Sequence, residues 1–547
     1  MILSVDINEK SFGSKTLFTG LDFSVEKGEK VGVIGRNGIG KTTLFNILAG
    51  SDKDFSGEVI LRRGTTMVAT SQEYHDVGEQ TTMEYITSGL PEFAELEKTI
   101  NGFGGLEKPT GRQVAEYSAA IERFSDKEYY FIEDKIRRAL EGFQLEHLAD
   151  RPFRTLSGGE KRLSEIVKIM LSDSHLALID EPTNYMDYVA KAQFIEWLQE
   201  TPEALLVITH DRDVLMNVDR IIEIKDGGAF SYPGNYNDYL VQNSTRTVTS
   251  MNEYEIVQRR IENLKKQIAA ARAKKAGWGG TADKKNPFVV IEERCLRELK
   301  KLQGVEKPSF WIDKLSASEL DYKNASRYEK YKAKNIRINL KSTESRSCRS
   351  LVRVSELAVG YEVALLQGVN FNLCEGESLE IRGRNGAGKT TLIKAILGRS
   401  GPKIFEGLVK LDGNAKISVY EQEVDSWLFD LLLPDAIAKI YMERGVNCTD
   451  QKVRSIMNNY LFEEADRNVK VRDLSGGQKA RLQIIAMLAI DPDLLVFDEP
   501  TSHLDLPSIE ELEAALAKYR GACLYISHDN YFRDKIGGMV VNLADGQ

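Results

Sequence analysis

Two short stretches of this chain combine glycine, lysine and threonine in a spacing suited to binding phosphate. GRNGIGKTT occupies 35–43 and GRNGAGKTT occupies 383–391. Both match G-x-x-x-x-G-K-[ST], in which glycines let backbone N–H groups surround phosphate oxygens and the lysine reaches the outer phosphates. Each stretch follows an apolar run, so two chance matches are not a credible explanation. The residues expected to hold the phosphates are Gly35, Asn37, Gly38, Gly40, Lys41, Thr42, Thr43, Gly383, Asn385, Gly386, Gly388, Lys389, Thr390 and Thr391.

Acidic residues end two further apolar runs, LALIDE at 176–181 and LLVFDE at 494–499. The last residues, Glu181 and Glu499, are placed to act as general bases that polarise an attacking water. A pair of surface carboxylates at a strand end is the alternative, and it is weak beside a phosphate loop in the same unit. The residues expected to hold Mg²⁺ are Thr42, Asp180, Thr390 and Asp498.

Three more pairs of residues recur in the two halves and are assigned to the same site. They are His210 and His528, Gln72 and Gln422, and Phe12 and Tyr361. The histidines follow apolar strands, where a catalytic sensor of the γ-phosphate would sit, and the glutamines are expected to contact Mg²⁺ and water. The aromatic residues precede the two lysines by 29 and 28 residues and suit stacking on adenine, although core packing explains them about as well.

These motifs repeat because the chain is a tandem duplication of one unit of roughly 200 residues. The lysines at 41 and 389 are 348 residues apart, whereas the histidines at 210 and 528 are 318 apart. The first unit therefore holds 30 extra residues between its lysine and the LSGGE at 156–160. Helical spacing in this segment predicts an added helical hairpin over about 85–135, which a surface decoration would also explain.

The composition excludes several classes of protein. The chain has 547 residues, 42% of them hydrophobic and 28% charged, with no apolar run long enough to cross a membrane. MILSVDINEK at the start has no basic, long-apolar pattern of a secretory signal and reads as a strand. The five cysteines are scattered, which argues against a zinc site or a disulfide framework. A cytoplasmic location is expected.

The middle of the chain is basic, although the total charge is −9. Residues 241–350 hold 25 lysines and arginines against 13 acidic residues. Two apolar seams predict an antiparallel pair of helices in this segment, and the first helix, about 244–275, would be about 45 Å long. The seam residues are Val257, Ile261, Leu264, Ile268, Ala271, Phe288, Ile291, Cys295, Leu299 and Leu302.

The predicted turn of this hairpin, AGWGGTADKKNPF, places a tryptophan and lysines at its tip. Ammonium groups suit phosphates and an indole can stack on an unpaired base, so RNA is the expected partner. A plain connecting hairpin is the alternative. The stretch 332–342 alternates apolar and polar residues and predicts a strand that opens the second unit. The RNA contacts expected are Lys274, Lys275, Trp278, Lys284 and Lys285.

LSGGE at 156–160 and LSGGQ at 474–478 resemble the signature of the ATP-binding cassette superfamily. The resemblance covers about 1–240 and 335–547. It implies two P-loop cassettes of α/β fold, ATP and Mg²⁺ as ligands, and hydrolysis to ADP and phosphate. It also implies that each ATP lies between the phosphate loop of one cassette and the signature of the other. The signature residues are Ser157, Gly158, Gly159, Ser475, Gly476 and Gly477.

The finer resemblance is to the ABC-F family, in which two cassettes share one chain and a charged helical linker joins them. It implies a first cassette at 1–242 with an arm at about 85–135, a linker at 243–332 and a second cassette at 333–547. The usual EPTNHLD is EPTNYMD and EPTSHLD here, and Asn530 replaces a usual arginine. These changes leave the catalytic carboxylates and histidines in place, so both sites are expected to be competent.

The resemblance implies a monomer that binds the ribosome near its exit site, with the linker tip reaching toward the P-site tRNA and the peptidyl-transferase centre. Two roles stay open, namely a general translation factor and an antibiotic-resistance protein that protects the ribosome. The ATPase subunit of a membrane transporter is a further alternative, although no stable membrane partner is expected. A DNA-repair ATPase is disfavoured, because its coiled coils lie inside a cassette.

Overall fold

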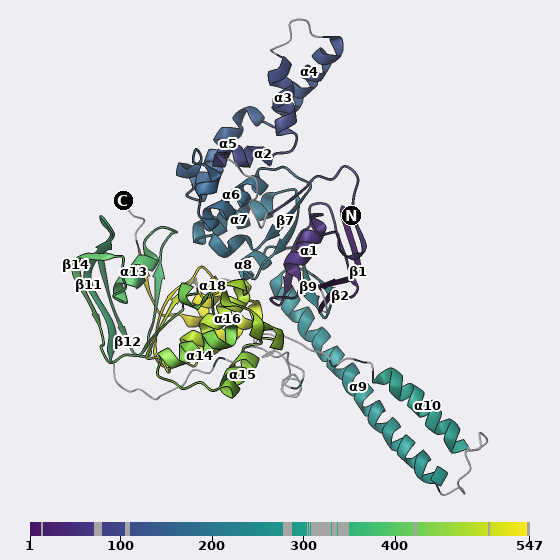
Figure 1. Ribbon diagram of the computed structural model, residues 1–547. Coiled ribbons are helices and arrows are strands. Elements are labelled where there is room, and N and C mark those ends of the chain that lie inside the picture. Colours follow the sequence, from purple (N-terminus) through teal and green to yellow (C-terminus); the bar gives the residue numbers. More distant parts are fainter. Residues whose placement is uncertain are drawn as a thin grey trace. The chain divides into compact units, whose positions relative to one another are not determined.

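The computed structural model consists of two compact units. One comprises Met1–Tyr236 and Ile336–Gln547, and the other is Asn237–Asn335. The sequence placed the middle segment at 243–332. Figure 1 labels the elements of the chain. The residues that the structure describes are 1–12, 15–70, 79–103, 110–276, 287–303, 305, 307, 330, 336, 338, 349–420, 424–501 and 504–543.

The first cassette is built on two sheets. A six-stranded sheet has the order β10-β9-β4-β8-β7-β6, with β9, β4, β8, β7 and β6 paired in parallel. An antiparallel sheet has the order β2-β1-β3, and β5 also pairs with β1. The strands are β1 (Leu3–Phe12), β2 (Lys15–Phe18), β3 (Leu21–Val25), β4 (Lys30–Gly35), β5 (Ser56–Leu61), β6 (Met67–Ala69), β7 (Leu176–Asp180), β8 (Ala204–Ile208), β9 (Arg220–Lys225) and β10 (Gly228–Pro233).

Helices cover both faces of the parallel strands, as their continuous apolar runs require. On one face, Leu44 of α1 packs with Val33 and Leu206. On the other face, Ile166 and Phe194 pack with residues of β7 and β8. Two helices, α3 and α4, occupy the segment where the sequence predicts an added hairpin. The helices are α1 (Lys41–Leu48), α2 (Thr82–Ser88), α3 (Phe93–Phe103), α4 (Gly111–Asp126), α5 (Ile132–Gly142), α6 (Gly158–Met170), α7 (Tyr188–Glu200) and α8 (Arg212–Leu215).

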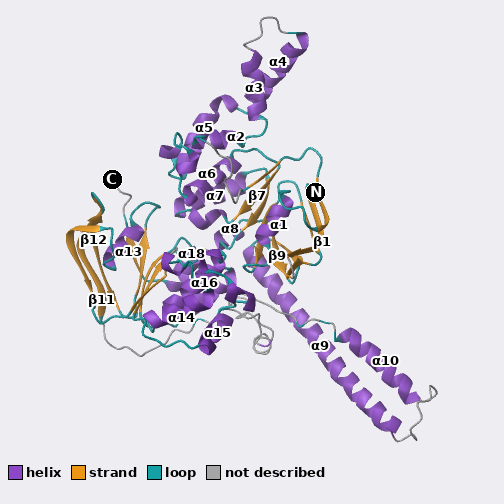
Figure 2. Cartoon of the chain, viewed as in Figure 1, coloured by secondary structure: helices purple, strands orange, loops and turns teal. Residues whose placement is uncertain are grey.

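The second cassette repeats this architecture (Figure 2). A parallel sheet has the order β15-β16-β17-β13-β18, and an antiparallel sheet has the order β12-β11-β14. The two cassettes confirm the predicted α/β fold class. The elements are β11 (Ser350–Gly360), β12 (Ala364–Cys374), β13 (Ser378–Arg382), α13 (Lys389–Ile396), β14 (Lys403–Leu411), β15 (Ile417–Tyr420), α14 (Leu433–Glu443), α15 (Asp450–Asn459), α16 (Gly476–Met487), β16 (Leu494–Asp498), α17 (Leu506–Leu516), β17 (Ala522–Ile526), α18 (Asn530–Ile536) and β18 (Met539–Asn542).

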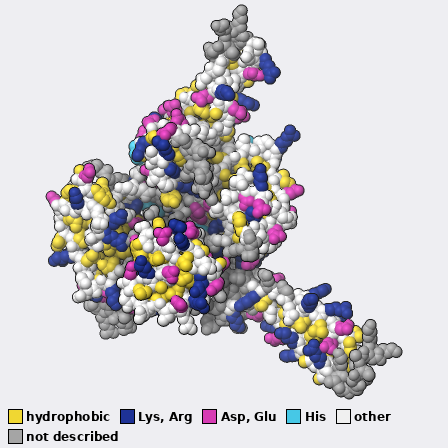
Figure 3. Space-filling view, in the orientation of Figure 1, with side chains coloured by type: hydrophobic (Ala, Val, Ile, Leu, Met, Phe, Trp, Pro, Cys, Tyr) yellow, Lys and Arg dark blue, Asp and Glu magenta, His cyan; other side chains and the backbone are white. Residues whose placement is uncertain are grey.

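The second unit contains two long helices, α9 (Tyr236–Ala276) and α10 (Pro287–Leu302). They pack antiparallel, as two ion pairs show: Arg260 pairs with Glu298 and Arg272 pairs with Glu292, each at 2.7 Å. A small apolar seam lies between them. It consists of Leu264, Ile268, Cys295, Leu299 and Leu302. Lysine and arginine side chains are frequent on the face of this hairpin seen in Figure 3.

The sequence assigned one residue to the seam wrongly. Ile291 is 45% exposed, and the neighbouring Glu292 turns toward α9 instead. The packed positions 295, 299 and 302 follow a 4-3 spacing, which continues to position 292 and leaves Ile291 facing away from α9. The strand predicted over 332–342 lies mostly outside the described residues. Of that stretch, Ile336 and Ile338 are described, and both are buried in the core of the second cassette.

We expect the hairpin to depend on Leu264, which is 1% exposed. Replacing it with alanine leaves a cavity and should cost about 2–5 kcal/mol of pairing free energy. Amide hydrogen exchange across α10 should therefore accelerate in the intact protein. Glu262→Ala, at an exposed position two residues away, is the control. Unchanged exchange in α10 of the Leu264→Ala protein would show that the seam does not hold the helices together.

Candidate functional site

Each phosphate loop turns from a buried strand into a short helix through a glycine with a left-handed backbone. Gly40 (φ 106°) precedes α1 and Gly388 (φ 87°) precedes α13, a conformation that favours glycine. The two lysines fold back along their own loops. Lys41 Nζ donates to Gly35 O at 2.7 Å, and Lys389 Nζ donates to the corresponding carbonyl at 2.8 Å. Burial lowers the pKa of both lysines.

A hydroxyl and a carboxylate meet at the start of each helix. Thr42 Oγ1 donates to Asp180 Oδ2 at 3.2 Å, and Thr390 Oγ1 donates to Asp498 Oδ2 at 2.9 Å. Both are hard oxygen ligands of the kind that Mg²⁺ prefers when substrate phosphates complete its shell. These residues therefore fit the predicted ion. Gln72 and Gln422, the other predicted ligands, lie outside the described residues.

A glutamate and a histidine face each other in both cassettes. His210 Nε2 lies 3.5 Å from Glu181 Oε1, and His528 Nε2 lies 3.3 Å from Glu499 Oε1. The backbone N–H of each histidine also donates to the other oxygen of its glutamate, at 3.4 and 3.2 Å. Both glutamates have positive φ angles, of 45° and 52°, which is uncommon for residues other than glycine and is typical of functional sites.

Burial shifts these groups toward their neutral forms. It raises the pKa of Glu181 to about 8 and that of Glu499 to about 7. It lowers the pKa of His210 and His528 to about 3, so the imidazoles are neutral at pH 7. A carboxylate with a pKa near neutrality is an effective general base, because it can take a proton from water and release it again. The geometry suits hydrolysis at both sites.

The two signature serines cap helices. Ser157 accepts a hydrogen bond from Glu160 N at the start of α6, and Ser475 accepts one from Gln478 N at the start of α16. These helices have 13 and 12 residues, and their N-termini favour anions.

The signature of the second cassette faces the phosphate loop of the first. A methyl group built on Gly477 would lie 2.4 Å from the side-chain nitrogen, Nδ2, of Asn37. A cavity of about 540 Å³ lies between them and is lined by Gly38, Ser475 and Gln478 among others. The structure thus brings together two of the elements that the sequence assigns to the first ATP site.

The reciprocal site is arranged differently. A cavity of about 500 Å³ is lined by Lys389, Thr390, Asp498, Glu499 and His528 together with Tyr185, and it extends to Glu181, His210 and Gly477 of the first site. Its lining does not include the signature of the first cassette. A methyl group built on Gly159 would lie 3.2 Å from the Tyr185 ring. Tyr185, one of the residues that depart from the family pattern, therefore stands beside the first signature.

Two aspartates that the sequence assignment missed join the cassettes reciprocally. Asn37 N donates to Asp505 Oδ2 at 3.1 Å, and Asn385 N donates to Asp187 Oδ2 at 3.0 Å. Each aspartate also caps the helix that follows it. The signal was present, because both are the last residue of the repeated stretches EPTNYMD and EPTSHLD. The spacing could not say that their partners lie in the opposite cassette.

The remaining predicted residues are less defined. Phe12 is 55% exposed, with Lys10 Nζ 4.6 Å from its ring, and Tyr361 is 43% exposed. Both are accessible for stacking, and that role stays a prediction. Lys274 is exposed near the end of α9. The side chain of Lys275 and the residues Trp278, Lys284 and Lys285 lie outside the described part of the chain.

Comparison with known proteins agrees with this architecture. Family models described as ABC transporter match 18–184, 366–502 and 222–286. The chain is 30% identical to ABC transporter F family member 5 of Arabidopsis thaliana, over 98% of this chain and 74% of that protein. It is 26% identical to Ribosome protection protein VmlR of Bacillus subtilis (strain 168), over 95% of this chain and 83% of that protein.

A solved structure shows the same fold. It is that of the archaeal ribosome recycling factor aABCE1 in complex with ribosomal stalk protein aP1, with a TM-score of 0.55 and 17% identity over 98% of this chain and 86% of that chain. Two phosphate loops and two signature motifs on duplicated α/β units define a tandem ATP-binding-cassette protein. No helix in the described residues is long and apolar enough to span a bilayer. The chain belongs to the ABC-F family.

The raised pKa values of the two glutamates predict that hydrolysis rises with pH through neutrality at both sites. In Glu499→Gln, where only the first site turns over, kcat/KM should rise with a midpoint near pH 8, because Glu181 must lose its proton to act as a base. In Glu181→Gln the midpoint should lie near pH 7, the pKa of Glu499. Steady-state ATPase assays from about pH 5.5 to about pH 9 measure both profiles. A flat profile over this range, which an ordinary glutamate with a pKa of about 4.3 would give, would contradict the prediction.

Proposed function

We propose that the protein hydrolyses ATP to ADP and phosphate at two sites, each shared between the cassettes. The reciprocal bonds of Asn37 to Asp505 and of Asn385 to Asp187 carry this proposal, because they place each phosphate loop against the other cassette. Lys41 and Lys389 would bind the β- and γ-phosphates, and loop N–H groups would surround them. Bound Mg²⁺, held by the paired threonine and aspartate oxygens, would neutralise phosphate charge.

Within each site the chain's own residues divide the work. Glu181 and Glu499 take the proton of the attacking water. Buried Glu499 Oε1 accepts no hydrogen bond within the described residues, so it is available for that proton. His210 and His528, neutral at pH 7, hold their glutamates through the backbone N–H and face the γ-phosphate. The signature residues 157–159 and 475–477 would donate from the opposite cassette, and Phe12 and Tyr361 would stack on adenine.

Because each site is built from two cassettes, nucleotide binding and the contact between the cassettes are coupled in one equilibrium. ATP contacts both halves and favours the closed pair, and hydrolysis removes the γ-phosphate that bridges them. The monomer needs no second copy, since both halves lie in one chain. The hairpin α9–α10 connects the cassettes in sequence and is the segment through which their state would reach a partner.

We propose the ribosome as that partner, bound near its exit site, with the hairpin tip directed toward P-site tRNA and the peptidyl-transferase centre. The net charge of +12 over 241–350 supports a polyanionic contact. Two similar proteins also support it, since one is a ribosome protection protein and the other a ribosome recycling factor. Lys274 and the tip residues would contact RNA, and a cytoplasmic location belongs to the same proposal.

The Glu181→Gln, Glu499→Gln double variant tests this directly. It should bind ATP, close and fail to reset, and therefore co-sediment with ribosomes through sucrose when ATP is present. Adding Lys41→Ala and Lys389→Ala, which removes the phosphate ligands, should abolish the ATP dependence. If the double variant binds ATP but does not co-sediment with ribosomes at any salt concentration, the proposal of the ribosome as partner is wrong.

A second role, protection of the ribosome from antibiotics, is favoured by the 26% identity to VmlR over nearly the whole chain. A susceptible strain that expresses the protein should then tolerate higher concentrations of drugs that bind the peptidyl-transferase centre. The same strain expressing Glu181→Gln, Glu499→Gln is the control. Equal growth inhibition in all strains would leave the general translation role.

A further inference from the structure

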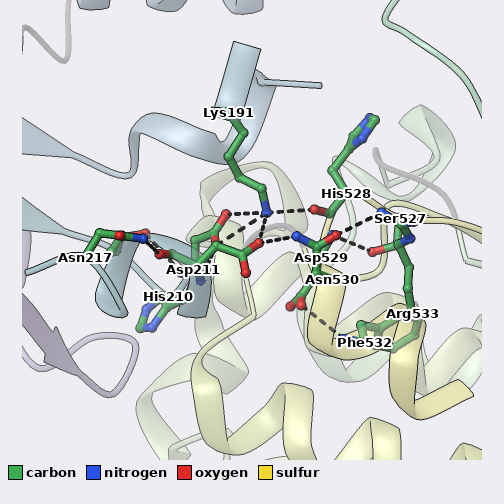
Figure 4. A network of polar contacts seen from close by, with 12 residues as sticks. Lys191, His210, Asp211, Asn217, Ser527, His528, Asp529, Asn530, Phe532 and Arg533 are labelled. Carbon is green, nitrogen blue, oxygen red and sulfur yellow. Dashed lines mark hydrogen bonds and ion pairs between the residues drawn. The ribbon is translucent and has the colours of Figure 1, made fainter. Parts of the chain in front are cut away.

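The contact between the cassettes is not symmetric, although the duplication is. A lysine, Lys191 of α7, reaches from the first cassette to the histidine loop of the second (Figure 4). Its Nζ donates to the backbone carbonyl oxygen of His528 at 2.8 Å. The same ammonium lies 2.6 Å from Asp213 and 3.2 Å from Asp211. The lysine side chain is 5% exposed, so water competes little for these bonds.

The repeat has no counterpart of this cation on the other side. The spacing of 318 residues aligns Lys191 with Ile509, a buried residue whose side chain cannot donate a hydrogen bond. It also aligns Asp213 with Tyr531, so the nearer of the two carboxylate partners is missing there, whereas Asp211 corresponds to Asp529. Ile509 and Lys191 line the same cavity. The first site therefore lacks an equivalent bond from the second cassette to the carbonyl of His210 at this position.

Further contacts fasten this one side. Asn530, the residue that replaces a usual arginine, donates from its side-chain amide to Asp213 Oδ2 at 2.7 Å. Arg212, its counterpart in the repeat, forms a buried pair with Glu513 of the second cassette at 2.8 Å. Glu513 aligns with Ile195, which cannot form such a pair. Both asymmetric contacts thus involve the loop 211–213 of the first cassette, one through Asn530 and the other through Glu513.

We propose that Lys191 is a positioning residue for the second ATP site. From the first cassette it holds the His528 backbone, and through His528 N, which donates to Glu499 at 3.2 Å, it holds the general base in place. The second site then needs the first cassette twice, once for its signature and once for the bond from Lys191. The first site has no equivalent bond at the aligned position, and Lys191 approaches it only through Asp211, which follows His210. This inference rests on the ATP hydrolysis proposed above.

The electrostatics of the site agree with this role. Burial lowers the pKa of Lys191, but the carboxylates of Asp211, Asp213 and Asp529 outweigh this effect, so its pKa is raised and the lysine stays charged. The cation is therefore present over the working pH range and the bond to His528 is charge-assisted, which makes it stronger than a neutral one.

Single-site backgrounds separate the two sites. In Glu181→Gln, where only the second site turns over, adding Lys191→Met should lower kcat about tenfold, the effect of losing one charged hydrogen bond, with KM for ATP within about twofold. In Glu499→Gln the same change should leave kcat within about twofold. Lys191→Arg should restore most of the loss, and Glu196→Gln, an exposed change on the same helix, is the control.

Two further measurements separate the role of Lys191 from loss of folding and from a failure of the proposed function. Lys191→Met leaves Asp213 near a second carboxylate without its cation, so the variant Lys191→Met, Asp213→Asn is measured beside it to guard against loss of folding. An equal fall of kcat in both backgrounds, or none in either, would overturn the role of Lys191. If the wild-type protein and both single-site variants bind ATP without hydrolysing it, the proposed function itself is wrong and this inference falls with it.

Discussion

The bond from a phosphate-loop N–H of one cassette to an aspartate of the other is the interaction on which the sites depend. Asn37 and Asn385 donate, and Asp505 and Asp187 accept. Each aspartate also caps a helix of its own cassette, which fixes its side chain there. The two glycine-rich loops are thereby bonded to the opposite half of the chain. A change in the position of either loop therefore affects a contact with the other cassette.

The same contact lies beside a group of buried ionisable residues. Glu181, Glu499 and both histidines are buried, and desolvation drives their pKa values toward neutral forms. Residues of both cassettes line the cavity that these four groups share. A buried carboxylate near neutral pH costs stability, and such groups cluster where chemistry needs them.

The sequence located the motifs of each site, and the structure places Thr42 beside Asp180 and Glu181 beside His210, with the same arrangement in the second cassette. They meet because each motif follows the carboxyl end of a neighbouring parallel strand of one sheet. Their roles in hydrolysis stay predictions. The resemblance implied that a phosphate loop faces the signature of the other cassette, but the bond from Lys191 to His528 escaped prediction, since the two residues are 337 apart and nothing local marks them as partners. Ile291 was assigned wrongly because it is apolar, whereas the 4-3 spacing of the packed positions of α10 places the polar Glu292 toward α9.

Duplication produces two sites of one chemistry, and divergence at a few contact positions can then give each site its own dependence on the rest of the molecule. A buried cation is a suitable means, because it must keep all of its partners once water is excluded. Lys191 has partners in both cassettes, whereas Ile509 can only pack. Movement between the halves would therefore strain the loop of His528 more than that of His210. One site would then respond to docking of the cassettes through this loop while the other keeps its catalytic geometry.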